Sequence, residues 1–239
     1  MIRMSKDIVR GTLEAVVIAF CAMSITALES CSDRYSISGT SLQSIYGANM
    51  AFLKSPSNSQ TIDSCEIIHG KFNMNGLLDS VQCLALVLGN MNVPVVLEHG
   101  NIQVSFANSS LTVSGTPLND KFYSFLTSRD SLTMLINELP SKESRMILEG
   151  VPEDEMFKML GEEEAELRSA LDKMDSDFIT DNYDNVLGVT WFLRLCNVES
   201  LKFGFPTTSP MLDEIYGKAP DSFRQNEEIV SFMNKVNGK

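Results

Sequence analysis

The hydrophobic pattern of this chain changes its period at Gly115, and this change limits the fold class more than any other feature. From Tyr35 to Ser114, short runs rich in Ile, Val, Phe and Leu are separated by Gly, Asn and Ser, and many alternate with polar residues, as β-strands do. After Gly115, apolar residues recur at helical spacing. The sequence therefore predicts an α+β protein with an antiparallel β-sandwich or barrel-like domain over residues 31–115 and a helical region over residues 116–239.

Eight strands are expected, at residues 35–40, 49–54, 61–68, 71–75, 81–88, 93–97, 101–106 and 110–114. The short connections between them favour antiparallel pairing. His69-Gly70 and His99-Gly100 each lie between apolar runs, and Gly adopts positive φ without strain, so both read as tight hairpin turns. In an up-and-down meander these two histidines would lie at opposite ends, roughly 17–20 Å apart. We therefore expect no shared metal site.

The helical region is predicted to begin with Thr116 as the cap and Pro117 at the first helical position, and the first helix is expected to end at Pro140. Further helices are expected at residues 141–149, 152–178, 186–198, 210–216 and 226–236. Trp191 and Phe192 lie within an apolar helical pattern, which places them in the core rather than in a ligand stack.

The acidic run Glu162-Glu163-Glu164, followed by Glu166, invites a cation-binding hypothesis. Helical neighbours one or two positions apart point in different directions, so these carboxylates cannot converge without a second element. We favour a solvated helix face. Gly161 is a candidate for a break just before the run.

The N-terminal segment resembles the signal of bacterial lipoproteins. Three basic residues precede an apolar run of about 14 residues, shorter than the ~20 that span a bilayer. The run ends in Leu28-Glu29-Ser30-Cys31, which resembles a lipobox, so we expect residues 1–30 to be a signal peptide and Cys31 to carry the lipid. Two alternatives remain: an uncleaved anchor, and a plain secretory signal in which Cys31 is incidental.

The charge of the chain bears on its partners. Residues 1–30 contain three basic and three acidic residues, so a mature chain would keep the net charge of −12. That acidity argues against nucleic acid and against adsorption to anionic lipid head groups as partners of the protein.

With the lipoprotein-like signal, we expect a lipid-anchored envelope protein, on the periplasmic face of the outer membrane, with no cofactor.

The cysteines left after loss of the signal and lipidation are Cys65, Cys83 and Cys196. Cys65 and Cys83 fall in predicted strands that could be neighbours, so a disulfide between them is one alternative in a compartment that permits disulfides. The reading that we favour has all three as small buried apolar residues. The chain has no Cys-x-x-Cys, the spacing expected of a redox-active dithiol.

Several short motifs in the strand region carry a family resemblance. They are Ile62-Asp63-Ser64, Gly70-Lys71-Phe72 with Gly76, Leu97-Glu98-x-Gly100-Asn101-Ile102 and Ser114-Gly115-Thr116-x-x-Asn119-Asp120. Together they resemble a domain of unknown function found in Bacteroidota lipoproteins, usually N-terminal to a thioredoxin-like, thiol-disulfide oxidoreductase domain. The helical part, notably residues 212–216, resembles the family's linker segment, which implies coverage of about residues 33–236. The printed chain ends at Lys239, where that oxidoreductase domain would begin, and the resemblance implies no catalytic residue.

These observations favour a noncatalytic envelope lipoprotein that binds a protein, peptide or glycan. The first alternative is an accessory to thiol-disulfide chemistry that works with a separate thioredoxin-like partner. The second is a hydrolase using Asp or Glu. A Ser-His-Asp triad has little support because both histidines fall in expected turns.

Overall fold

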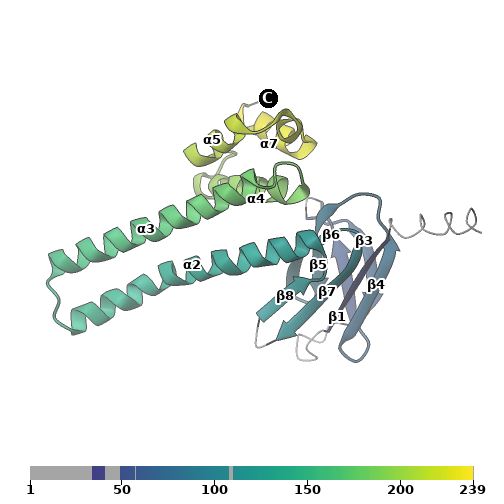
Figure 1. The fold of residues 1–239 in the computed structure, drawn as a ribbon, viewed down its shortest axis with the longest axis horizontal. Helices are drawn as coiled ribbons and strands as arrows, with labels where there is room; N and C mark the ends of the chain where they lie inside the picture. The colour runs from purple at the N-terminus through teal and green to yellow at the C-terminus, as the bar shows by residue number, and fades with distance from the viewer. Residues whose placement is uncertain (1–33, 41–48, 57, 108–109, 239) are drawn as a thin grey trace, which may run out of the picture.

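The computed structural model describes residues 34–40, 49–56, 58–107 and 110–238. Its strands are β1 (Arg34–Thr40), β2 (Met50–Lys54), β3 (Thr61–Glu66), β4 (Lys71–Leu77), β5 (Gln82–Leu88), β6 (Met91–Leu97), β7 (Gly100–Ala107) and β8 (Ser110–Ser114). Its helices are α2 (Pro117–Leu148), α3 (Glu153–Thr180), α4 (Val186–Phe203), α5 (Pro210–Lys218), α6 (Asp221–Arg224) and α7 (Glu227–Val236). Figure 1 shows the strands grouped together and the helices beyond them, which confirms the predicted α+β class.

The strands form a sandwich of two four-stranded sheets. Sheet A has the order β4-β1-β7-β8, and sheet B has the order β3-β2-β5-β6. Alternate residues of the strands point between the sheets, where Ile37, Leu53, Leu86 and Val104 are among the buried side chains. The alternation of apolar and polar residues in the sequence therefore corresponds to one buried face on each sheet.

One strand pairing differs from the expected antiparallel arrangement, because β1 is antiparallel to β4 but parallel to β7. A tight turn can join only antiparallel strands, whereas parallel neighbours need a long connection. Here the chain passes through β2, β3, β4, β5 and β6 before it returns as β7 beside β1. The connection between β1 and β7 is therefore long enough for the two strands to run parallel.

The two His-Gly turns connect the sheets to each other. At His69-Gly70 both residues have positive φ, 51° and 73°, and Ile68 and Lys71 exchange two backbone hydrogen bonds, so the predicted tight turn is confirmed. The hairpin predicted at His99-Gly100 is wrong, because β6 pairs with β5 whereas β7 pairs with β1 and β8. The up-and-down meander is wrong, because both turns lead from sheet B to sheet A. The histidines still lie at opposite ends of β1. His99 Nδ1 is 3.0 Å from the Arg34 carbonyl oxygen, and the strand that follows His69 pairs with the other end of β1.

Helices α2 and α3 form a long antiparallel hairpin that projects from the sandwich (Figure 1). The predicted break at Pro140 is wrong, because α2 continues through it to Leu148. Proline removes one backbone donor, and contacts with α3 on both sides of that position, from Arg129 and from Lys142, offset the loss. Gly161 does not break α3. Among the described residues no helix combines the length and apolarity that crossing a bilayer requires.

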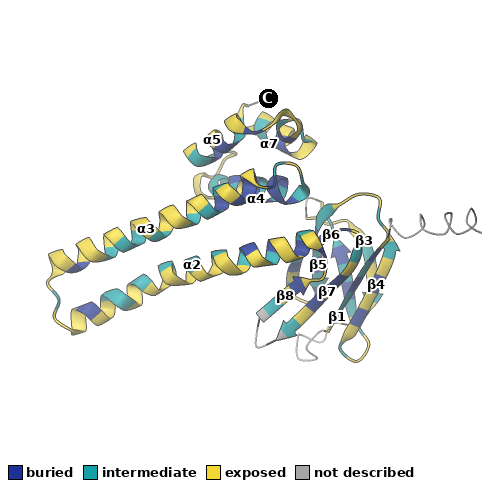
Figure 2. Cartoon of the chain, in the orientation of Figure 1, coloured by how far each residue is buried: buried dark blue, intermediate teal, exposed yellow. Residues whose placement is uncertain are grey.

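A second core lies where the hairpin meets α4, α5, α6 and α7, and Figure 2 shows buried residues concentrated there. Trp191 and Phe192 are 1% and 0% exposed, which confirms their predicted place in the core. Phe125 stacks on Phe178 with ring centroids 3.7 Å apart, and Trp191 meets both rings edge-on. These aromatic contacts join α2, α3 and α4 at the base of the hairpin.

A buried ion pair reinforces this core. The Arg129 guanidinium donates two hydrogen bonds to the Asp175 carboxylate, at 2.8 and 3.1 Å, and thereby joins α2 to α3. Trp191 Nε1 donates a third bond to Asp175 at 2.9 Å. The same guanidinium lies over the Trp191 ring. The Asp175 side chain is only 4% exposed, and these three donated bonds compensate its burial.

Candidate functional site

The motif residue Asn119 joins the first turn of α2 to the edge of sheet B. Its side-chain oxygen accepts from the Val96 backbone N–H at 3.0 Å, and its amide nitrogen donates to the Val96 carbonyl at 2.7 Å. Asn119 therefore takes the place of a neighbouring strand beside β6, which is an edge strand. Pro94 lies two residues before Val96 on the same strand and has no backbone N–H. Its carbonyl accepts a hydrogen bond from the Tyr123 hydroxyl. The start of α2 thus covers this sheet edge.

The N-terminus of α2 is capped by Glu98 and not by the expected side chain of Thr116. Glu98 Oε1 accepts from the backbone N–H groups of Leu118 and Asn119 at 2.9 and 3.0 Å. A carboxylate here satisfies free N–H groups and also complements the helix dipole. Thr116 instead accepts from the Asn119 amide at 2.9 Å. Thr116 lies at the N-cap position, as predicted, but its side chain makes no capping hydrogen bond, and Glu98 supplies the acceptor instead.

Further motif residues form cross-strand pairs of an aromatic ring and a glycine. Tyr35 lies over Gly76, where an added Cβ would come within 2.6 Å of the ring, and its hydroxyl donates to Asp63 Oδ2 at 2.7 Å. Phe72 lies over Gly39 in the same way. The hydrogen bond from Tyr35 on β1 to Asp63 on β3 links sheet A to sheet B. These contacts give the family motifs a structural explanation.

The three cysteines do not come together. Cys65 lies on β3 and packs against the sandwich core, whereas Cys83 lies on β5 and packs on the other side of sheet B against the helical core. Strand β2 separates β3 from β5, so the expectation of neighbouring strands is wrong, and both thiols are free. Cys196 is buried within the helical core. The favoured prediction of three buried cysteines is correct for Cys196 alone, because Cys65 and Cys83 are only partly buried.

We predict that the thiols of Cys83 and Cys196 are unreactive in the folded protein. Burial raises the pKa of Cys83 to about 11 and that of Cys196 to about 12, so the thiolate fraction of Cys83 at pH 8 is about a thousandth. Alkylation by iodoacetamide, followed by peptide mass spectrometry, should be slow at pH 8 and fast in urea. Because folding favours the protonated thiols, their contribution to stability is complete below the ordinary thiol pKa and is lost as the pH rises toward 11–12.

The corresponding functional assay is insulin reduction, which we expect the protein not to catalyse. A dithiol catalyst needs two sulfur atoms within disulfide geometry. Catalysis that disappears in Cys65→Ser or Cys83→Ser, with the fold retained, would contradict this prediction.

The acidic run on α3 forms ordinary surface ion pairs. Glu163 pairs with Lys142 across the hairpin, and Glu164 pairs with Arg168 on its own helix at 2.6 Å. Over the described parts of the chain, no group of three or more His, Cys, Asp or Glu side chains could hold a metal ion. These contacts agree with the solvated helix face that the spacing predicts.

The outer face of sheet A is a surface without an assigned structural role. Its outward side chains form cross-strand rows: Asn73, Ser38, Gln103 and Ser114 in one, and Asn75, Ser36 and Asn101 in the next. A third pair, Ser105 and Thr112, shares a 2.7 Å hydrogen bond. All nine are uncharged hydroxyl or amide side chains that can donate and accept. We refer to these nine residues as the polar face.

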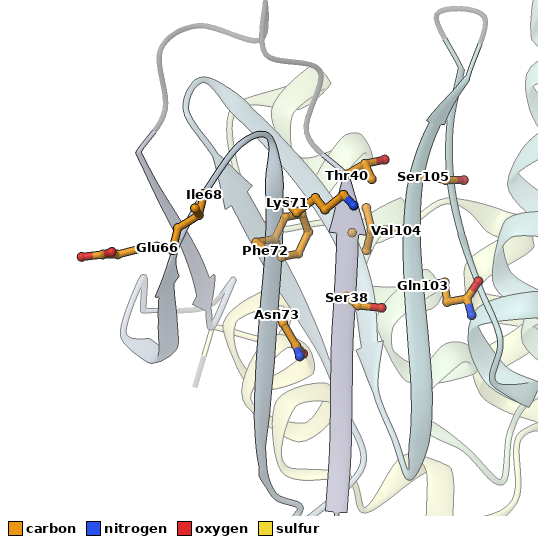
Figure 3. A pocket seen from close by; sticks show the side chains of 11 residues that line it. Ser38, Thr40, Glu66, Ile68, Lys71, Phe72, Asn73, Gln103, Val104 and Ser105 are labelled. Atoms are coloured by element: carbon orange, nitrogen blue, oxygen red, sulfur yellow. The ribbon is translucent and has the colours of Figure 1, made fainter.

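Two shallow hollows lie along this face. The larger, of about 690 Å³, includes Ser38, Asn73, Gln103 and Ser105 in its lining, and Figure 3 shows the first three on neighbouring strands. The smaller, of about 520 Å³, includes Ser36, Asn75 and Asn101 at the other end of the same strands. Charged groups occur at the ends, with Glu66 and Lys71 lining the larger hollow and Arg34 lining the smaller.

Reasoning from the sequence did not identify this face. The signal was present as Ser, Asn and Gln at alternate positions of β1, β4 and β7. That alternation indicates which side of each strand is exposed, but it does not say which strands are neighbours.

Residues 35–122 match the sequence model of a domain of unknown function, DUF4369. No curated protein and no solved structure matches the chain. The match begins in β1 and ends in α2 three residues beyond Asn119, so it includes Val96, Glu98 and Asn119 at the junction between the sandwich and the helix. The family resemblance was expected to continue through the helical region to residue 236, but the match ends at residue 122. Over the sandwich and the first turns of α2, the chain is therefore similar to DUF4369.

Proposed function

We propose that this protein is a membrane-tethered lipoprotein of the cell envelope that acts as a noncatalytic binding module. The observation that carries the proposal is the polar face, a broad surface of hydrogen-bonding side chains held on a rigid sheet. Strand β1, within this face, is paired with β4 on one side and β7 on the other, so its backbone is held along both edges. A site built on strands holds its groups more precisely than one built on loops.

The proposed tether is Cys31, which lies outside the described residues together with the rest of segment 1–33. Its support is the lipobox-like Leu28-Glu29-Ser30-Cys31 and the basic and apolar segment before it. The proposed location is the periplasmic face of the outer membrane, in a Bacteroidota-type envelope. The resemblance also suggests an association with thioredoxin-like proteins, but the separated thiols give no support to a redox role for this chain.

The tether predicts a clear result for Cys31→Ala. Several acyl chains on one cysteine supply durable anchoring, at about 0.8 kcal/mol per buried methylene. We expect the variant to move from the membrane fraction to the soluble fraction after alkaline washing, while Cys65→Ala stays with the membrane. A Cys31→Ala chain that remains in the membrane with its N-terminus intact would contradict the lipid anchor.

The binding role can be tested with a photo-cross-linking side chain placed at Gln103 in the cells that make the protein. The matched control carries the same group at the exposed Gln225, at the C-terminal end of α6. We expect an adduct from position 103 that position 225 does not give. The absence of any adduct from the polar face, whether with protein, peptide or glycan, would contradict the proposed module.

A further inference from the structure

The polar face combines two properties that together indicate one class of ligand. The protein carries a net charge of −12, yet the nine side chains of this face are all neutral. A surface with about 25–35% charged residues favours solubility, whereas these nine positions have charged neighbours only at the strand ends, at Lys71 and Arg34. A charged ligand would find no complementary charge here except at the ends of the strands.

The backbone of the sheet also limits what can bind. Strand β1 is paired along both edges, with β4 and with β7, so its peptide groups are occupied. A peptide that binds by strand addition needs a sheet edge, so in sheet A it would pair with β4 or β8 at the borders and not lie on the face between them. A ligand lying on the polar face meets side chains alone, and these offer paired donors and acceptors.

We propose that the polar face binds an uncharged polysaccharide, a chain whose many hydroxyl groups both donate and accept hydrogen bonds. This inference rests on the proposed binding function and specifies its site and ligand class. The two hollows lie end to end along the seven residues of β1, a length of roughly 20 Å. An extended chain of several sugar units would lie along β1, between the amides of β4 and those of β7.

Asn73 and Gln103 are the groups to change, because each lies next to Ser38 in the central row. The double variant Asn73→Asp/Gln103→Glu keeps the shape of both side chains but replaces two donating amides with carboxylates. The matched control, Asn137→Asp/Gln225→Glu, makes the same atomic and charge changes at exposed positions in the helical region.

The full-length protein, in a sugar-free detergent, is run through native gels containing dextran, mannan or xyloglucan, with polygalacturonate as the acidic comparison. We expect at least one neutral polymer to retard the wild type and the control variant, and the apparent dissociation constant to rise about tenfold or more in Asn73→Asp/Gln103→Glu. Circular dichroism and thermal unfolding show whether both variants are folded.

The alternative outcomes overturn the inference in different ways. Retention by polygalacturonate alone would mean that the ligand is acidic. Neutral-polymer binding that is unchanged in Asn73→Asp/Gln103→Glu would place the site elsewhere. A lack of retardation by every neutral polymer would refute the ligand class, whereas a protein adduct at Gln103 in the photo-cross-linking experiment would leave the binding module itself intact.

Discussion

Asp175→Ala is expected to lower the free energy of unfolding by about 3–5 kcal/mol, one of the two largest effects of any substitution that we predict. Asp175 accepts two hydrogen bonds from Arg129 and one from Trp191. Its removal leaves a guanidinium that is only 23% exposed, and an indole N–H in the core, without their partner. Breaking one side of a buried pair costs far more than the pair contributes, because an uncompensated charge remains in the protein.

The control for this prediction is Asp177→Ala on the same helix. Asp177 pairs with Lys173, and both side chains are more than half exposed, so its loss should cost less than about 1 kcal/mol. Asp175→Asn keeps an acceptor for Trp191 but removes the charge that faces Arg129, so it should fall between the two. Urea unfolding followed by Trp191 fluorescence measures all three. Equal stabilities of the Asp175→Ala and Asp177→Ala variants would contradict the structural role of the buried pair.

The elements of the fold were predictable because their signals are local. Alternating apolar residues gave all eight strands to within a few residues, and Gly115-Thr116-Pro117 marked the start of α2. Pro140 shows the limit of this approach. A local rule predicted a helix end there, and the contact between α2 and α3, which the local sequence does not encode, overrode it.

The sheet order was less accessible because it depends on partners far apart in the sequence. Tyr35 pairs in register with Gly100, 65 positions later, and neither residue carries a local sign of this pairing. The cap on α2 has the same origin, since Glu98 lies 20 positions before Leu118. The polar face follows from this order, because only the adjacency of β4, β1, β7 and β8 brings its residues into rows.

Asn119→Ala is expected to destabilise the protein by roughly 2–4 kcal/mol. The Asn119 side chain is fully buried and binds both backbone groups of Val96, which is itself 0% exposed. Alanine would leave that buried N–H and C=O without partners, at a cost of about 1–3 kcal/mol for each unsatisfied group, partly relieved if water enters. The effect should exceed that of an ordinary surface asparagine because this residue joins the helix to the sheet edge.

Asn137→Ala tests this explanation on the same helix. Asn137 is exposed on α2, so its replacement removes an identical side chain and should leave stability within about 0.5 kcal/mol of the wild type. Hydrogen exchange provides a second readout, since the Val96 amide should lose protection in Asn119→Ala while the amides of β2 at the centre of sheet B lose less. If the Val96 amide stayed as protected as in the wild type, the sheet edge would have to be held by contacts other than Asn119. The junction would then depend on Glu98 and on Tyr123, which donates to the Pro94 carbonyl of the same edge strand.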